Sequence, residues 1–139
     1  MSETVVLDTN VFTARLRKDR PLEAQYLKHT VGRRIAVAPQ TVAEARYGAL
    51  VAGWGSRRIE KLGRWMGEVA ILDVDVETME KVAQLRNQCR LIGHALHQRL
   101  HNADLWIAAA AVRWGLPLVA HDAVFVGCPE LDLRTEVGD

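Results

Sequence analysis

Cysteine and long apolar runs are both scarce in this chain, and their scarcity excludes several classes of protein. Two cysteines, Cys89 and Cys128, are too few for a disulfide framework and lack zinc-site spacing, so we expect both to be reduced and structural. The longest apolar run, from Trp106 to Val112, is too short to cross a bilayer. A strand pattern already begins near Thr4, which leaves no room for a secretory signal. These features predict a soluble cytoplasmic protein that does not enter a membrane.

An excess of one charge is lacking as well. The 139 residues include 18 Lys and Arg and 17 Asp and Glu, which gives a formal net charge of +1. This balance neither demands nor excludes a nucleic-acid partner, because the basic residues are clustered whereas the acids are scattered. No shift in composition, repeat or linker divides the chain, and 49% of its residues are hydrophobic. We therefore expect a single domain over residues 1–139 with a substantial core.

Apolar strand patterns alternate with helical patterns along the chain. The strand patterns cover residues 4–7, 35–38, 69–74, 116–120 and 131–133. Helical spacing covers residues 11–19, 21–31, 41–52, 56–66, 76–91 and 104–114, with Thr41 placed to cap the third of these helices. Because strands that alternate with helices pair in parallel, the pattern predicts a three-layer α/β/α sandwich. Its central, mostly parallel sheet should have four to five strands.

Four acids fall where a parallel sheet would bring side chains together. Asp8 ends the first strand, Glu44 lies one turn into the helix after the second strand, Asp104 opens the Ala-rich helix, and Asp122 follows the fourth strand. Each has an ordinary structural interpretation, as a loop acid, a first-turn charge, an N-cap or a turn residue. Their shared position argues for more, because ligands of such sheets bind outside the carboxyl ends of the strands.

Four carboxylates at one edge of a sheet would repel one another unless a cation lay among them. An all-oxygen ligand set suits Mg²⁺ or Mn²⁺, whereas a zinc site would need His or Cys at a fixed spacing. A bound divalent ion can orient a water, lower its pKa and neutralise charge on a phosphodiester. The acids therefore predict a Mg²⁺ or Mn²⁺ site for phosphodiester hydrolysis.

Four segments occur in a specific order and spacing: Leu7–Asn10, Ala43–Ala49, Ala103–Ala111 and Leu116–Phe125. Together they resemble the PIN-domain family, and within it the VapC-type ribonuclease toxins of type II toxin–antitoxin systems. The resemblance implies a PIN-like fold with Asp8, Glu44, Asp104 and Asp122 as metal-binding and catalytic acids. It also implies a Mg²⁺- or Mn²⁺-dependent endoribonuclease that cleaves RNA with a metal-activated water and leaves a 5′-phosphate.

The resemblance further implies two protein partners, a second copy of the chain and a cognate antitoxin that inserts a basic side chain among the acids. Apolar residues exceed what a small sheet obviously needs, so some could form a partner groove, although all could equally be core. The residues in question are Leu16, Leu22, Tyr26, Leu27, Leu50, Val51, Trp54, Leu62 and Trp65. Gly48 is expected to allow a close contact between helices.

One departure from the family concerns Ala120, where many members carry Thr or Ser two positions before the last acid. His121 or Thr9 would have to support the site instead, and we assign Thr9 and Asn10 to that supporting role. Three histidines, His94, His97 and His101, have a spacing that superficially suits a metal. Their glycine-flanked, polar context favours a flexible loop.

Two groups of basic residues are candidates for binding substrate phosphates. Arg15, Arg17, Lys18 and Arg20 follow Asp8 closely in sequence and are the preferred candidates. In a second group, Arg57, Lys61 and Arg64 fall on one helical face, with Arg58 beside them and Trp54 and Trp65 near. These residues could follow an RNA backbone and stack a base, although a solvated helix face is the more common explanation of such spacing.

Two other functions remain open from the sequence. The first is a nucleic-acid- or protein-binding module that has kept the fold and lost catalysis, which Ala120 makes conceivable. The second is a phosphatase in which Asp8 is the covalent nucleophile of a DxD-type loop, and Asn10 argues against it because the loop would need a second aspartate.

Overall fold

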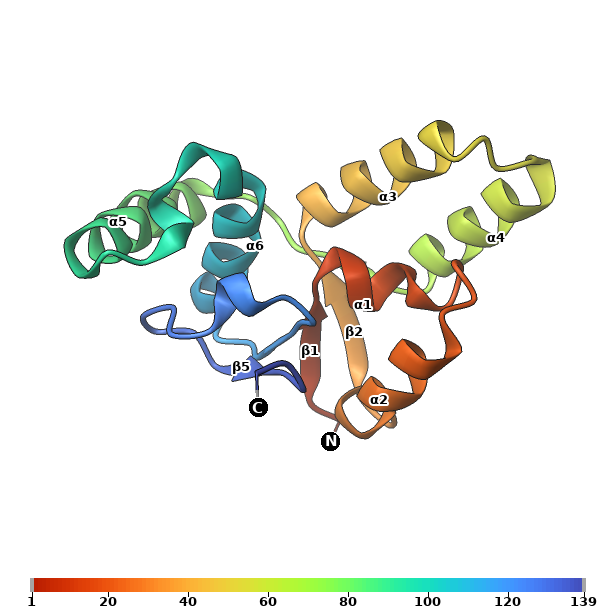
Figure 1. The fold of residues 1–139 in the computed structure, drawn as a ribbon, viewed down its shortest axis with the longest axis horizontal. Coiled ribbons are helices and arrows are strands. Elements are labelled where there is room, and N and C mark those ends of the chain that lie inside the picture. Colours follow the sequence, from red (N-terminus) through yellow and green to blue (C-terminus); the bar gives the residue numbers. More distant parts are fainter. Residues whose placement is uncertain (1, 139) are drawn as a thin grey trace.

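Strand β1 (Thr4–Leu7) is the middle of a five-stranded sheet in the computed structural model, which describes residues 2–138 (Figure 1). The other strands are β2 (Arg34–Val37), β3 (Ala70–Ile71), β4 (Leu118–Val119) and β5 (Leu133–Arg134). Their order is β3-β2-β1-β4-β5, and every neighbouring pair is parallel. The predicted parallel α/β architecture is confirmed, and all strands end at the same edge of the sheet.

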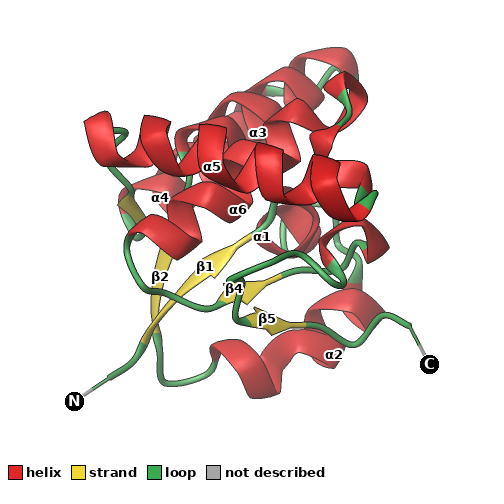
Figure 2. Cartoon of the chain, turned by 90° about the vertical axis from the view of Figure 1, so that its left-hand side faces the viewer, coloured by secondary structure: helices red, strands yellow, loops and turns green. Residues whose placement is uncertain are grey.

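Helices cover both faces of this sheet, which makes three layers (Figure 2). They are α1 (Thr9–Ala14), α2 (Arg20–Thr30), α3 (Pro39–Val51), α4 (Ser56–Gly67), α5 (Val76–Ile92) and α6 (Asn102–Arg113). Three short 3₁₀ helices complete the chain: η1 (Ala95–His97), η2 (Arg99–His101) and η3 (Ala123–Phe125). None of the helices described between residues 2 and 138 has the length and apolar character needed to cross a membrane.

The alternation of side chains along β1 divides the core in two. Val6 belongs to the cluster that packs with α5 and α6, whereas Val5 and Leu7 belong to the cluster with α1, α2 and α4. Successive side chains of a strand point to opposite faces, and helices cover both faces here, so all three are buried. This explains why the sequence of β1 is a continuous apolar run.

Helices α3 and α6 each begin two residues before their predicted starts. Helix α3 begins at Pro39, since proline is favoured at the first helical position, and Thr41 is buried inside the helix instead of capping it. Consequently Glu44 lies past the first turn, and its ordinary interpretation as a first-turn charge does not apply. Helix α6 begins at Asn102, so Asp104 is in its first turn and is not its N-cap.

The first helix is shorter than the predicted range of residues 11–19. It ends at Ala14, and Asp19 caps α2 by accepting a hydrogen bond from the Leu22 amide at 3.2 Å. The strand pattern at 69–74 likewise yields only Ala70–Ile71. That strand is at the sheet edge and pairs with β2 alone, so fewer residues are held in the ladder.

The histidine-rich stretch after α5 is not a flexible loop but forms η1 and η2. His94 caps η1, because its Nδ1 accepts a hydrogen bond from the Leu96 amide at 3.1 Å. Its Nε2 lies 2.8 Å from the carbonyl oxygen of Val126. Both ring nitrogens are therefore used within the protein, which removes His94 as a metal ligand.

Other sequence expectations divide between core and surface. Leu16, Leu22, Tyr26 and Leu62 are buried, whereas Leu27, Leu50 and Val51 are exposed. Cys89 and Cys128 are free and buried, as predicted, and burial raises the pKa of the Cys128 thiol to about 12. The expected close contact at Gly48 is wrong, since no atom lies within 4 Å of the place a Cβ would occupy.

Candidate metal centre

Asp8 stands where β1 passes into α1, and its carboxylate is fixed by two backbone amides. Oδ1 accepts a hydrogen bond from the Val11 amide at 2.9 Å, which caps α1. Oδ2 accepts one from the His121 amide at 3.3 Å, across the sheet edge from the end of β4. Only 3% of the residue is exposed. The sequence thus places a buried acid in one orientation at the carboxyl end of the central strand.

The environment of Asp8 shows that other acids are close. The pKa of Asp8 is raised from 3.8 to about 7, chiefly by burial and also by the charges of Asp122 and Asp104, while the two amide hydrogen bonds act in the opposite direction. A carboxyl group titrating near neutral pH is unusual, because the charged form of an exposed aspartate is strongly favoured there. Such a shift marks a site that favours a cation nearby.

Asp104 lies in the first turn of α6 and shares this environment. Its pKa is raised to about 6, chiefly by burial and also by the charges of Asp122 and Glu44. His101, with Nδ1 3.7 Å from the Asp104 Oδ2 atom, acts in the opposite direction. The Asp104 carboxylate therefore interacts electrostatically with acids from two other parts of the chain, Asp122 and Glu44.

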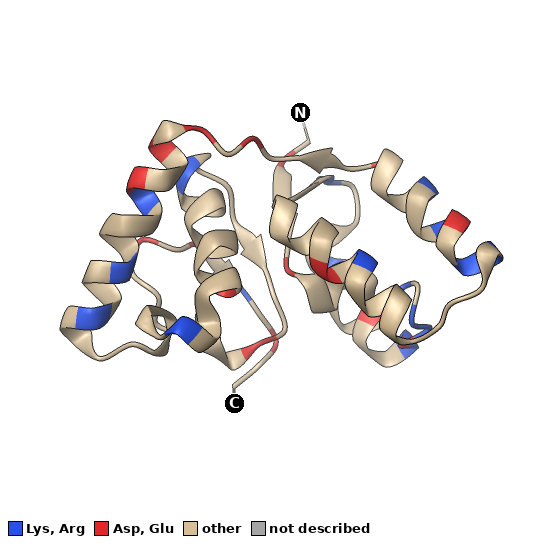
Figure 3. Ribbon diagram, turned by 90° about the horizontal axis from the view of Figure 1, so that it is seen from above, with Lys and Arg blue, Asp and Glu red and all other residues tan. Residues whose placement is uncertain are grey.

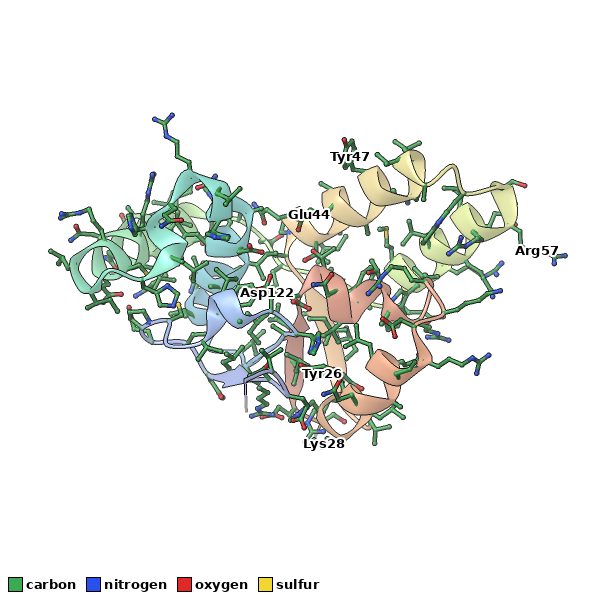
Figure 4. All side chains as sticks on the ribbon, viewed as in Figure 1. Tyr26, Lys28, Glu44, Tyr47, Arg57 and Asp122 are labelled. Atoms are coloured by element: carbon green, nitrogen blue, oxygen red, sulfur yellow. The ribbon has the colours of Figure 1, made fainter. Side chains whose placement is uncertain are left out.

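Glu44 belongs to α3 and is tied to the start of α1. The Thr9 hydroxyl donates a hydrogen bond to Glu44 Oε1 at 2.7 Å, and it lies 3.4 Å from the Thr41 hydroxyl. This contact fixes the glutamate side chain, which is otherwise exposed. Figure 4 shows Glu44 and Asp122 near the carboxyl end of β1, on different elements.

Asp122 follows β4 and caps η3, where its Oδ1 accepts a hydrogen bond from the Val124 amide at 2.9 Å. It is partly buried, and its charge contributes to the raised pKa values of both Asp8 and Asp104. Within residues 2–138, no hydrogen bond to its second carboxylate oxygen is formed. That oxygen is free to contact a cation.

The donor set fits a hydrated Mg²⁺ or Mn²⁺ ion better than a closed cage. In the part of the chain that the structure describes, no three His, Cys, Asp or Glu side chains converge closely enough to surround one ion. Mg²⁺ keeps several of its waters and is usually held by one or two carboxylates. Oxygen ligands alone and two carboxyl groups with raised pKa values match such an ion.

Residues 5–128 match the PIN domain family. The chain belongs to the PIN-domain family. Among curated proteins, Ribonuclease VapC5 of Mycobacterium tuberculosis (strain ATCC 25618 / H37Rv) is 32% identical over 122 residues, which cover 86% of this chain and 84% of that protein. The similarity to a VapC protein confirms the resemblance seen in the sequence.

Solved structures agree with this assignment. VapBC-5 from Mycobacterium tuberculosis, a member of the VapBC family of toxin–antitoxin systems, is 27% identical, with 95% of this chain and 96% of that chain covered and a TM-score of 0.62. VapBC2 from Rickettsia felis, bound to a DNA fragment from their promoter, is 22% identical, with 95% and 98% covered and a TM-score of 0.78. At that identity the second likeness shows the fold alone.

Tyr26 of this PIN domain anchors the backbone after β4 next to Asp8, a role that the sequence did not indicate. Its buried hydroxyl donates a hydrogen bond to the Ala120 carbonyl oxygen at 3.0 Å and accepts one from the Glu136 amide at 3.0 Å. The same oxygen lies 2.8 Å from His121 Nδ1. Tyr26 therefore holds the segment whose next amide binds Asp8, at the position where Ala120 lacks the hydroxyl common in the family. A separation of 95 residues between Tyr26 and His121 leaves no sequence signal for this contact.

We expect Tyr26→Phe to lower the free energy of unfolding by about 1–3 kcal/mol, because the change leaves buried backbone groups without a partner. Mn²⁺ affinity should fall as well, because the segment carrying His121 and Asp122 loses its anchor. Urea unfolding and calorimetric Mn²⁺ titration measure the two effects. Tyr47→Phe is the matched control, since Tyr47 is 69% exposed and points away from the acids (Figure 4). Equal values for the two variants would contradict the role given to Tyr26.

The other predicted site residues, which are Asn10, His121 and Arg15, differ in what they contact. Asn10 is exposed and lines a groove between α1 and α3. The His121 ring contacts Tyr26, and it is the backbone amide of His121 that contacts Asp8. Arg15 lies beyond the far end of α1, with its guanidinium carbon 5.1 Å from the Trp65 ring. Arg15 therefore packs against Trp65 at that end of the helix.

Proposed function

We propose that this PIN domain is the toxin of a toxin–antitoxin pair, an endoribonuclease that hydrolyses RNA with Mg²⁺ or Mn²⁺. The hydrated ion would bind among Asp8, Glu44, Asp104 and Asp122, and it would contact some of these carboxylates through its waters. The supporting observation is electrostatic: Asp8 and Asp104 have raised pKa values, and in each case the charge of Asp122 contributes. The four carboxyl groups come from four parts of the chain: the N-cap of α1, helices α3 and α6, and the N-cap of η3. The similarity to Ribonuclease VapC5 supports the reaction class.

The residues have distinct roles in this proposal. A bound divalent ion would supply a water of lowered pKa and positive charge beside the scissile phosphate. Asp8 and Asp104 would give up their protons on binding the cation, so affinity should rise with pH. Asp8 keeps a fixed orientation through its two amide hydrogen bonds, and Thr9 orients Glu44. Asp122 contributes a carboxylate with one free oxygen.

Metal removal tests the reaction directly. Purified protein should cleave single-stranded RNA when Mg²⁺ or Mn²⁺ is present, stop when EDTA is added, and resume when Mn²⁺ is returned. The new ends should carry a 5′-phosphate, which ligation-based sequencing detects. Undiminished cleavage in EDTA would overturn the metal requirement. Mn²⁺ binding by calorimetry without any cleavage would favour the non-enzymatic binding module.

The residues beside Asp8 argue against the phosphatase alternative. A DxD-type loop would need a second aspartate, and position 10 is Asn. A phosphoaspartate trapped at Asp8 would reverse this judgement.

Protein partners belong to the same proposal. A groove of about 240 Å³ between α1 and α2, lined by Val11, Leu27 and Ile35 among others, would accept an apolar antitoxin segment. Tyr47, Leu50 and Val51 on α3 are 69–75% exposed and would bury that area in a homodimer. Co-purification with the product of a neighbouring gene tests the antitoxin, and light scattering tests the dimer. A monomeric mass would exclude the homodimer.

A further inference from the structure

Basic side chains from two separate segments converge on one cavity beyond the end of α1. The cavity has a volume of about 210 Å³ and lies between that segment and α4. Its lining includes five cations, Arg15, Lys18, Arg58, Lys61 and Arg64, and a single acid, Glu68. A chain with a formal net charge of +1 thus gathers a large share of its positive charge at one place.

Most cations of this cavity have no anionic partner within the protein. Elsewhere Arg113 pairs with Asp75 at 2.6 Å, and Arg134 pairs with Glu3 at 2.6 Å. Among the ion pairs formed by residues 2–138, none includes Arg15, Lys18, Lys61 or Arg64. Unpaired like charges around one concave surface attract a polyanion and gain affinity by releasing its counterions.

The cavity is held in shape by contacts between α4 and the segment around α1. The Trp65 indole nitrogen donates a hydrogen bond to the Phe12 carbonyl oxygen at 3.0 Å. Arg58 Nη2 donates one to the Leu16 carbonyl oxygen at 2.9 Å, and its guanidinium carbon lies 3.9 Å from the Trp54 ring. These contacts preorganise the cations.

Helical spacing selects which basic residues of α4 take part. Lys and Arg recur along this helix (Figure 3), but Arg57 lies at its outer end and points away from the body (Figure 4). Arg58, Lys61 and Arg64 follow at intervals of three and line the cavity. The sequence predicted a basic face made of Arg57, Lys61 and Arg64. In the structure Arg58 takes the place of Arg57 on this face.

A groove leads from Glu44, one of the four acids, to these cations. It has a volume of about 360 Å³, runs between α1 and α3, and is lined by Thr9 and Glu44 at one end and by Trp54 and Arg58 at the other. Gly48 lines it as well, with no atom near its missing side chain. Because Arg58 lines both groove and cavity, one extended ligand can contact the metal centre and the cations.

We propose that this cavity binds backbone phosphates of single-stranded RNA at a distance from the scissile bond. The proposal rests on the proposed function and names where that substrate gains affinity. Helix α1 separates the two sites by about 9 Å, given 1.5 Å per residue over its six residues. One divalent ion carries less charge than four ionised carboxylates, so cations elsewhere would add to the attraction of the RNA backbone. A chain of regularly spaced phosphates can satisfy both sites at once.

The test compares two double variants of equal charge change. Lys61→Ala with Arg64→Ala removes two exposed cations of the cavity, and Arg34→Ala with Arg57→Ala removes two exposed cations elsewhere. For a twelve-nucleotide RNA in Mg²⁺, we expect the first variant to raise KM roughly tenfold with kcat unchanged. A trinucleotide substrate should show no change in KM. The slope of log affinity against log salt should shrink by about 1.4 for two lost phosphate contacts.

Binding of the same fluorescent RNA in EDTA gives a second, cleavage-independent measurement. The first variant should bind about tenfold more weakly than the control variant, with circular dichroism showing equal folding. Equal RNA affinity and equal KM for the two variants would overturn the proposal, as would loss of antitoxin binding with RNA binding unchanged. Failure of the wild type to cleave any RNA would refute the proposed function instead, and the EDTA measurement would still decide whether the cavity binds RNA.

Discussion

Replacing Asp8 or Asp104 by asparagine should lower kcat/KM for RNA cleavage by at least about a thousandfold, while the protein stays folded. An asparagine is neutral, so it neither holds a divalent cation strongly nor releases a proton when the cation binds. At position 8 the amide oxygen can still accept one of the two backbone hydrogen bonds, from Val11 or His121. Loss of the other costs about 1 kcal/mol, too little to unfold the domain.

The matched control is Asp73→Asn, which changes the same chemical group at an exposed position after the edge strand β3. Asp73 is not among the charges that raise the pKa of Asp8 or Asp104. This variant should cleave RNA as the wild type does. Single-turnover cleavage with Mg²⁺ measures the rates, and calorimetric titration with Mn²⁺ measures affinity. If a purified protein carrying both Asp8→Asn and Asp104→Asn retained metal-dependent cleavage, the assignment of these acids would be wrong.

Stability of the metal-free protein should fall as pH rises from 5 to 8. Asp8 has a pKa of about 7 when folded against 3.8 as its ordinary value, so between these values the folded state binds more protons than the unfolded state. Its contribution is therefore complete below pH 4 and is lost as pH rises through 7. The shift corresponds to about 3 kcal/mol between pH 5 and pH 8, and Asp104 acts in the same direction.

Carboxyl groups whose pKa is lowered do not change the stability between pH 5 and pH 8. The pKa of Glu3 is lowered to about 2 by Arg134 and Arg33, and the pKa of Asp75 is lowered by Arg113. Stability from those pairs is present above pH 4 and is lost only in acid. A decline between pH 5 and pH 8 therefore reports the buried acids.

Urea unfolding at a series of pH values measures the effect. Asp8→Asn should flatten the profile, because the amide does not titrate, whereas Asp73→Asn should leave it unchanged. Mn²⁺ at a hundredfold excess over its Kd should add about 2.7 kcal/mol at pH 8, and less at pH 5 where protons compete. A wild-type profile that rises with pH in metal-free buffer would contradict the burial of a protonated carboxyl group.

The sequence alone determined the fold class and the positions of the four acids. Val5, Val6 and Leu7 form an apolar run, which is typical of a strand covered on both faces. This pattern is local in the sequence, so it can be recognised without knowing the tertiary contacts. In a parallel sheet all strands end at one edge. The sequence therefore predicts that Asp8 and Asp122, each of which follows a strand, lie close together.

Only the tertiary structure decided what surrounds those acids. The Tyr26 hydroxyl contacts Ala120 and His121, and the Thr9 hydroxyl contacts Glu44. Arg15 and Lys18 join Lys61 and Arg64 around a single cavity. The residues in each group are far apart in the chain, so the packing of α1, α2 and α4 on the sheet brings them together. Periodicity records which face a side chain occupies within its own element, but it carries no information about the partner across that face.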